Sequence, residues 1–172
     1  YVIFDHNTVL NEKFFPDNRQ YISFFVMSLP LFLLGIVDDK INLRANIKLI
    51  IMIIILTFTI WIDADLQIET ISFSFLSESI ELKRFSLVFT LFSIIIFINA
   101  INMIDGIDLL AGTYLLFLIF FIFVKSDIDN LLILISIGLL NFLYLNYKRK
   151  LFLGDNGSIF CAYLVGYLFI KS

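Results

Sequence analysis

The sequence predicts an all-α, polytopic transmembrane helical bundle with about six spanning helices. Composition is the first reason, because 60% of the 172 residues are hydrophobic and only 16% are charged, against about 45–50% and about 25% in soluble domains. The mean hydropathy is +0.99. The second reason is that the apolar residues form continuous runs. A transmembrane β-barrel needs alternating segments of ~10 residues, so helices are favoured.

Six apolar runs are bounded by polar or charged clusters, and we interpret each run as one spanning helix. The runs cover residues 21–37, 45–62, 85–101, 107–124, 131–146 and 158–170. Several are shorter than the ~20 residues that a hydrocarbon core of ~30 Å requires, so flanking polar residues or a thinner bilayer must complete them. Pro30 should kink the first helix without ending it.

The count of spans predicts which connections share a side of the membrane. One group comprises 38–48, 102–106 and 147–157, and the other comprises 1–20, 63–84 and 125–130. Lys and Arg divide equally between the two sides, but the first group is about half as long, so the positive-inside tendency makes it cytoplasmic. The segment 63–84 alternates apolar and polar residues and should form a small hairpin on the opposite interface.

Several classes of protein are excluded by what the chain contains. A single Cys161 excludes an intramolecular disulfide, and a single histidine, His6, excludes a multi-histidine zinc site within these residues. The 12 Lys and Arg are scattered and outnumbered by 15 acidic residues, so no nucleic-acid partner is expected. The chain starts with Tyr1 and has no signal-peptide pattern. We therefore interpret residues 1–172 as a single transmembrane helical domain from a longer protein.

Five carboxylates fall on the predicted cytoplasmic side: Asp38, Asp39, Asp105, Asp108 and Asp155. Carboxylates side by side repel one another, and an Asp at bilayer depth costs ~2.5–3.5 kcal/mol on insertion scales, so a compensating cation is expected. Because no His or Cys accompanies them, the ligands are hard oxygens, which suit Mg²⁺, or Mn²⁺, better than zinc. Mg²⁺ keeps positions open for substrate phosphates, and a phosphate-bearing substrate follows as a hypothesis.

The first acidic motif is G-I-V-D-D at 35–39, where the first helix leaves the membrane. Paired Asp residues at a helix end also serve as plain flanking or capping residues. In the functional interpretation, one carboxylate beside another and near a cation accepts a proton from a phosphate or orients the water around the metal.

The second motif is N-A-I-N-M-I-D-G-I-D at 99–108, in which an oxygen-bearing side chain recurs every third residue. Gly106 should break the helix and let Asn99, Asn102, Asp105 and Asp108 converge. The alternative makes Asp105 the N-cap of the next span, which leaves Asp108, expected just inside that span, unexplained.

The third motif is F-L-G-D-N-G-S at 152–158, which joins a basic stretch to the last apolar run. Gly154 and Gly157 would let the backbone approach a ligand closely, and Ser158 would cap a helix whose N-terminal amides favour an anion. A plain loop is the alternative.

Taken in this order and spacing, the three motifs resemble those of the polyprenyl-phosphate N-acetylhexosamine-1-phosphate transferases. The resemblance runs from about Leu31 to the end of the chain. It implies that Asp155 is the Mg²⁺ ligand, that the acidic pair acts on the lipid phosphate, and that Lys48 contacts phosphate. Family members have about ten or eleven spans and a His-rich cytoplasmic loop, and they suggest a homodimer. They usually carry Gly where this chain has Leu109.

The resemblance predicts transfer of a sugar 1-phosphate from a UDP-N-acetylhexosamine to polyprenyl (undecaprenyl) phosphate, with release of UMP, at the cytoplasmic face of the plasma (inner) membrane. Eleven residues are candidates for this site. The catalytic candidates are Asp38, Asp39, Asp105 and Asp108; the metal candidates are Asp155 and Asn102; the substrate-binding candidates are Lys48, Asn99, Gly154, Gly157 and Ser158.

Two other kinds of membrane protein carry buried acids. An ion- or proton-coupled transporter is the first, but it predicts a transmembrane path with acids near the midplane. A CDP-alcohol phosphotransferase is the second, but its D-G-x-x-A-R signature fails at 105–110, where the Arg is absent. A structural subunit leaves Asp108 and the acidic pair without a role.

Overall fold

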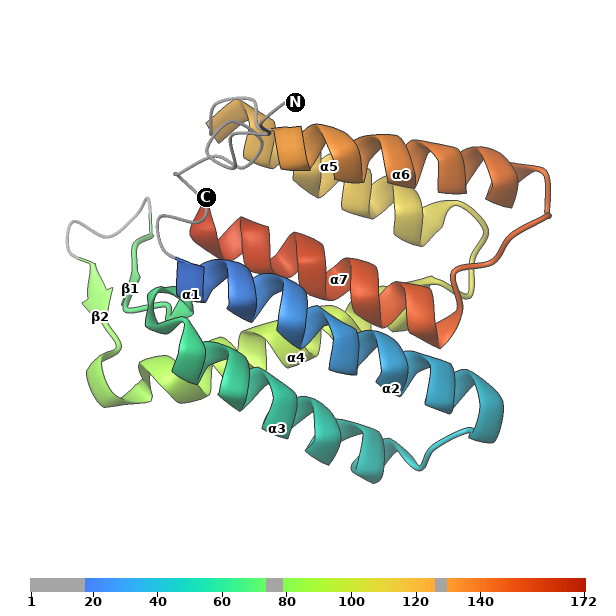
Figure 1. The fold of residues 1–172 in the computed structure, drawn as a ribbon. Coiled ribbons are helices and arrows are strands. Elements are labelled where there is room, and N and C mark those ends of the chain that lie inside the picture. The colour runs from blue at the N-terminus through green and yellow to red at the C-terminus, as the bar shows by residue number, and fades with distance from the viewer. Residues whose placement is uncertain (1–17, 74–78, 126–129) are drawn as a thin grey trace, which may run out of the picture.

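The computed structural model describes residues 18–73, 79–125 and 130–172, and these residues are mainly helical (Figure 1). His6 lies outside them. The long helices are α2 (Met27–Ile41), α3 (Ala45–Ile62), α4 (Ser86–Ile104), α5 (Leu110–Lys125), α6 (Asn130–Tyr147) and α7 (Gly154–Lys171). Each of the six predicted runs corresponds to one of these helices, which confirms the all-α polytopic fold.

Within the part of the chain that the structure describes, four helical segments are long and apolar enough to cross a membrane: Arg19–Ile41, Ala45–Ile62, Lys83–Ile104 and Asn130–Tyr147. Helix α5 is apolar but shorter, with 16 residues. Helix α7 has a long buried face and carries polar residues such as Asp155 and Tyr163, which it can hold because protein surrounds much of it instead of lipid.

The first helix is continuous through Pro30, as predicted. It begins as α1 (Asn18–Tyr21), passes through the π-helical segment η2 (Ile22–Val26) and continues as α2. Pro30 has no N–H to donate to the carbonyl of Val26, the last π-helical residue, so the wider turn lies where the proline interrupts the α-helical hydrogen-bond ladder.

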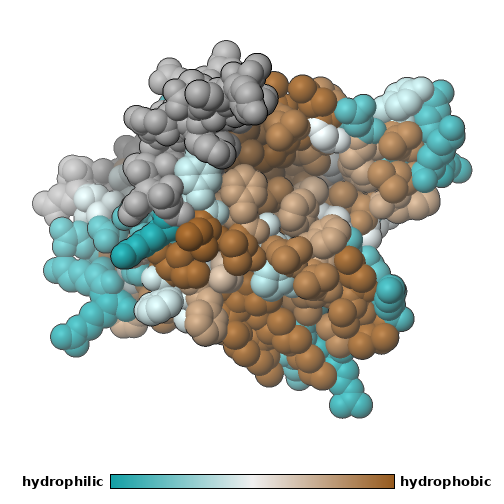
Figure 2. All heavy atoms as spheres, in the orientation of Figure 1, coloured by the Kyte–Doolittle hydropathy of each residue, from teal (hydrophilic) through white to brown (hydrophobic). Residues whose placement is uncertain are grey.

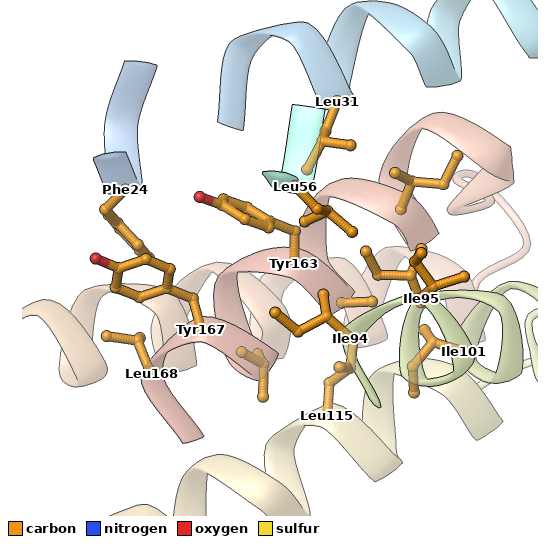
Figure 3. Packing of buried hydrophobic residues seen from close by; sticks show 14 of the residues in the cluster. Phe24, Leu31, Leu56, Ile94, Ile95, Ile101, Leu115, Tyr163, Tyr167 and Leu168 are labelled. Atoms are coloured by element: carbon orange, nitrogen blue, oxygen red, sulfur yellow. The ribbon is translucent and has the colours of Figure 1, made fainter. Parts of the chain in front are cut away.

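Helix α7 lies at the centre of the bundle and packs against α2, α4 and α5. Its side chains Tyr163, Tyr167 and Leu168 are fully buried among Leu31, Leu56 and other apolar residues (Figure 3). On the outside, apolar side chains cover the flanks of the helices between more hydrophilic ends (Figure 2), and Trp61 is 80% exposed. An apolar exterior of this kind is the surface that a bilayer solvates.

The connections 42–44, 105–109 and 148–153 all lie at one end of the bundle (Figure 1). This is the grouping that the count of spans predicts. At the other end, η3 (Ala64–Leu66) and η4 (Lys83–Phe85) flank an antiparallel hairpin of β1 (Thr70–Ile71) and β2 (Ile80–Glu81). The hairpin predicted in 63–84 is therefore present, although residues 74–78 lie outside the described ones.

Candidate active site

The three acidic motifs meet at the end of the bundle that holds the short connections. The C-terminus of α2 brings Asp38 and Asp39, the C-terminus of α4 brings Asp105, and the first turn of α7 brings Asp155. Lys48 joins them from the start of α3. The ends of α2 and α4 and the starts of α3 and α7 lie on the same side of the bundle. They therefore bring together residues more than 100 positions apart in the chain.

Lys48 bridges two of the acids. Its ammonium lies 2.5 Å from Asp38 Oδ2 and donates a 2.9 Å hydrogen bond to Asp155 Oδ1. The other oxygen of Asp38 accepts the backbone N–H of Leu43 at 2.8 Å. Because Asp38 and Lys48 are both largely buried, removal of Lys48 would leave the Asp38 carboxylate without its counter-charge, whereas Lys48 would keep Asp155 if Asp38 were removed.

Asp39 has different partners, although it is the next residue. Its two carboxylate oxygens accept the backbone N–H groups of Asp155 and Asn156, at 2.9 and 3.2 Å. Gly154, immediately before them, has φ +65°, a left-handed conformation that glycine adopts without strain. Gly35 lies one turn before Asp39 on α2, and a Cβ there would come within 2.2 Å of the Cα of Asn156.

Asp105 is half-buried beside the same turn of α7, close to the backbone N–H of Gly154. Burial raises the pKa of Asp105 from 3.8 to about 6; the negative charges of Asp155 and Asp39 add to the shift, while the nearby N–H of Gly154 opposes it. Asp105 occupies the C-cap of α4 and not the N-cap of α5.

Asn102 and Ser158 form a second layer behind Asp155. The buried hydroxyl of Ser158 donates to Asn102 Oδ1 at 2.6 Å, and the Asn102 amide lies beside the Asp155 carboxylate. Ser158 does not cap α7 as predicted, because the helix begins four residues earlier, at Gly154. The acceptors for its first amides come from α2 and α4, a source that a local sequence pattern cannot indicate.

Three candidates lie apart from this network. Asn99 donates to the carbonyl of Ile95 in its own helix, and Gly157 packs against the Leu153 side chain. Asp108 is exposed and has no ion pair or hydrogen bond among the described residues. The prediction that Asp108 lies just inside the next span is wrong, because α5 begins at Leu110 and Asp108 precedes it in the connecting turn.

Comparison with known proteins identifies the family to which this chain belongs. The sequence model of glycosyl transferase family 4 matches residues 21–172. The chain belongs to glycosyl transferase family 4. No solved structure matches it significantly.

Curated members of the family align over much of this chain. A protein of Bacillus subtilis (strain 168), described as a probable undecaprenyl-phosphate N-acetylglucosaminyl 1-phosphate transferase, is 32% identical over 80% of the chain and 40% of its own length. A phospho-N-acetylmuramoyl-pentapeptide-transferase of Thermoanaerobacter sp. (strain X514) is 26% identical over 92% of the chain and 55% of its own length. The chain thus spans about half the length of these relatives.

Leu109 stands where the resemblance predicts a glycine, and the backbone there is unusual. Leu109 has φ +68°, in the left-handed region that favours glycine. Its N–H donates at 2.7 Å to Oδ1 of Asn146, a buried side chain at the end of α6. The Asn146 amide donates in turn to the carbonyl of Leu151 at 2.8 Å.

Asn146 therefore ties the connection after α4 to the connection before α7. Sequence analysis missed Asn146. Its only signal was an amide side chain near the end of an apolar run, and polar residues are common at helix ends, so the pattern does not indicate a buried contact.

The donor set suits a hard divalent cation such as the one proposed from the sequence. The carboxylates of Asp38 and Asp155 contact the Lys48 ammonium, and those of Asp39 and Asp105 lie against the first turn of α7. Within the described part of the chain, no three His, Cys, Asp or Glu side chains are placed to hold one metal ion together. A Mg²⁺ at Asp155 would use one or two carboxylates, the Asn102 amide, water and phosphate, as Mg²⁺ commonly does.

Proposed function

We propose that this chain forms part of an enzyme that transfers a sugar 1-phosphate, most simply N-acetylhexosamine 1-phosphate, from a UDP-sugar to polyprenyl phosphate. The observation that carries the proposal is the convergence of Asp38, Asp39, Asp105 and Asp155, two of them paired with Lys48, at one end of an apolar bundle. Membership of glycosyl transferase family 4 and the names of the relatives support the same reaction class.

The reaction joins two anions. An oxygen of the polyprenyl phosphate attacks the phosphorus that carries the sugar, a new P–O–P bond forms, and the bond to the UMP oxygen breaks. UMP leaves with that oxygen and its negative charge, and the product is a polyprenyl-diphosphate sugar. The protein must therefore offset charge repulsion and align the two phosphates, which is most of what catalysis of phosphoryl transfer requires.

The roles of the side chains follow from their partners. Asp155 and Asn102 would hold Mg²⁺, which supplies neutralisation of phosphate charge when bound. Lys48, beside Asp155, offers an ammonium group to a phosphate. Asp105, close to Asp155 and Asp39, is the acid whose ionisation a bound cation would favour most. A carboxylate that takes a proton from the lipid phosphate needs to act only as a weak base, since the second pKa of the phosphate is ~6 and most of it is already ionised at neutral pH.

The site would face the cytoplasm in the plasma membrane. Lys40, Arg44, Lys148, Arg149 and Lys150 lie at the same end of the bundle as the acids, in agreement with the positive-inside tendency. At that interface a soluble UDP-sugar meets the head group of a lipid whose chain stays in the bilayer. The apolar flanks in Figure 2 are the surface along which such a lipid would approach. Homodimer formation stays a prediction.

The transporter alternative lacks a pathway in this arrangement. Along α2 to α7, Asp and Glu occur only in the terminal turns, and α3, α4, α5 and α6 contain none. Acids gathered at one end suit a reaction at the interface better than a relay through the midplane.

The proposal is tested by measuring UMP release from several UDP-N-acetylhexosamines by the full-length protein in membranes, with undecaprenyl phosphate and Mg²⁺. Turnover that requires both substrates and stops with EDTA is expected. Asp155→Asn should lose at least 100-fold in rate, consistent with loss of a metal ligand, whereas Glu81→Gln at the other end should keep the wild-type rate. Unchanged turnover in Asp155→Asn, or no lipid-dependent UMP release by the wild type with any UDP-sugar, would contradict the proposal.

A further inference from the structure

The two adjacent acids of α2 serve different neighbours. Asp38 faces α3, where it pairs with the Lys48 ammonium, and it also accepts the N–H of Leu43 in the connection that follows α2. Asp39 faces α7, where both of its oxygens accept backbone amides. Successive residues on a helix point about 100° apart, so one helix end can contact two different helices in this way.

The first amides of α7 are held from outside that helix. The N–H groups of Asp155 and Asn156 donate to Asp39, and Asp105 lies close to the N–H of Gly154. Helix N-termini leave their first amides without partners inside the helix, and an Asp near them also complements the helix dipole. In this chain α2 and α4 supply the carboxylates, so the first amides of α7 already have acceptors and are not free for a substrate anion.

The spacing of the first motif fits this contact. Gly35 and Asp39 are four residues apart and lie on one face of α2. Gly35 allows the two helices to touch, since any Cβ there would overlap the backbone of Asn156. Asp39 then lies over the amides of the same turn. The left-handed Gly154 completes the fit, because a Cβ on it would come within 3.3 Å of both Asp39 oxygens.

We infer that Asp39 is a positioning residue that fixes the first turn of α7, and with it the proposed metal ligand Asp155, and that it does not take a proton from the lipid phosphate. This inference rests on the proposed function for the meaning of Asp155. Its structural part, that Asp39 holds the amides of Asp155 and Asn156, stands without it. Of the acidic pair, Asp38, which contacts Lys48, is then the member that would act on the lipid phosphate.

Two substitutions separate positioning from proton transfer. Asp39→Asn keeps one acceptor oxygen, and Asn is as good a helix cap as Asp, but it cannot act as a base. Asp39→Ala removes both acceptors. Both variants are compared with Glu81→Ala, which removes a carboxylate at the other end of the bundle, in the full-length protein reconstituted in lipid nanodiscs.

The first measurement is hydrogen exchange at the start of α7, followed by mass spectrometry without substrates. Asp39→Ala should raise the exchange rate of peptides that contain Asp155 and Asn156 at least tenfold, Asp39→Asn should raise it less, and Glu81→Ala should not change it. Equal exchange in the wild type and Asp39→Ala would overturn the inference. This readout does not depend on turnover, so it decides the structural part even if the proposed reaction is wrong.

The second measurement is the Mg²⁺ concentration that gives half-maximal UMP release. Asp39→Asn should retain at least a tenth of the wild-type rate at saturating Mg²⁺ with a several-fold higher half-saturating concentration, and Asp39→Ala should need still more Mg²⁺. If both variants are equally inactive at saturating Mg²⁺ and the wild type is active, Asp39 takes part in the chemistry and the inference fails. An inactive wild type would instead count against the proposed function.

Discussion

The two ends of the bundle each join α3 to α7 through a Lys–Asp pair, but they differ in charge balance. At the end away from the motifs, Asp63 at the C-cap of α3 receives Lys171 at 2.9 Å and the hydroxyl of Tyr167, and Asp63 is only 2% exposed. One acid meets one base there. At the other end, Lys48 meets Asp38 and Asp155, with Asp39 and Asp105 close by.

This difference separates a structural contact from a functional one. A buried pair of opposite charges with a hydroxyl partner is balanced and requires no further ion. It holds the end of α7 against α3. An assembly of four carboxylates and one ammonium group carries excess negative charge, and the charges of Asp155 and Asp39 add to the effect of burial in raising the pKa of Asp105. A further cation would relieve that excess, so the unbalanced end is where we place the chemistry.

The largest effect on stability is expected from removal of the Lys171–Asp63 pair, at the end of the bundle where the charges balance. Lys171→Met leaves the buried Asp63 carboxylate without its counter-charge and should lower the free energy of unfolding by about 3–5 kcal/mol. Adding Asp63→Asn to Lys171→Met should recover much of that loss. Thermal unfolding of the full-length protein in detergent measures both. A single variant as stable as the wild type would show that this pair does not hold α7.

The next effect concerns the contact that brings the acids together. Gly35→Ala places a Cβ 2.2 Å from the Cα of Asn156, so α2 and α7 must separate, and we expect about 1–3 kcal/mol of destabilisation together with loss of turnover. Gly138→Ala in α6 is the matched control, since a Cβ there meets nothing within 4 Å. It should stabilise the protein by about 0.5–1 kcal/mol. Equal effects of the two substitutions would argue against close packing at Gly35.

The unbalanced end should also show in the pH dependence of stability. Because the folded-state pKa of Asp105 is raised to about 6 from 3.8, the folded protein holds a proton that the unfolded chain has lost between these values. Stability therefore falls as the pH rises from about 4 to 6, and the cost is complete above that range.

Comparison of Asp105→Asn with the wild type isolates this contribution. The melting temperature of Asp105→Asn relative to the wild type should rise between pH 4 and 6 and level off above it, and Mg²⁺ should reduce the difference. A difference in melting temperature between Asp105→Asn and the wild type that stays constant from pH 4 to 6 would exclude a raised pKa at Asp105.

The smallest effect is expected at the strained turn before α5. Leu109→Gly should relieve the left-handed backbone at φ +68° and stabilise the protein by up to about 1 kcal/mol, after the greater chain entropy of glycine is allowed for. Leu109→Ala keeps a Cβ and the strain, so it should gain nothing. Equal melting temperatures for the two variants would contradict this explanation.

Most of the fold followed from the sequence because apolar runs, and the parity of the connections between them, are local and countable. The same parity predicted that Asp38, Asp105 and Asp155 would meet. Their individual partners were not predictable. Whether Asp39 pairs with a lysine or with backbone amides depends on how α2 docks on α7, across 116 residues of chain.

The start of α7 illustrates the limit of local patterns. Ser158 has the residue type and position of an N-cap for the last apolar run, yet the helix extends back to Gly154 because side chains of other helices accept its first hydrogen bonds. Likewise, the sequence marks Leu109 as an unusual residue for its motif, but only the backbone reveals that it adopts a glycine-like conformation.

Direct metal binding tests the central claim, that the excess of carboxylates at one end binds a divalent cation through Asp155. The full-length protein, purified in detergent, is titrated with Mn²⁺ while the EPR signal of free Mn²⁺ is followed. We predict one site per chain that Mg²⁺ competes for, weakened at least tenfold by Asp155→Asn and unchanged by Glu81→Gln. Equal Mn²⁺ affinity in Asp155→Asn and the wild type, or no bound Mn²⁺ in the wild type, would contradict it.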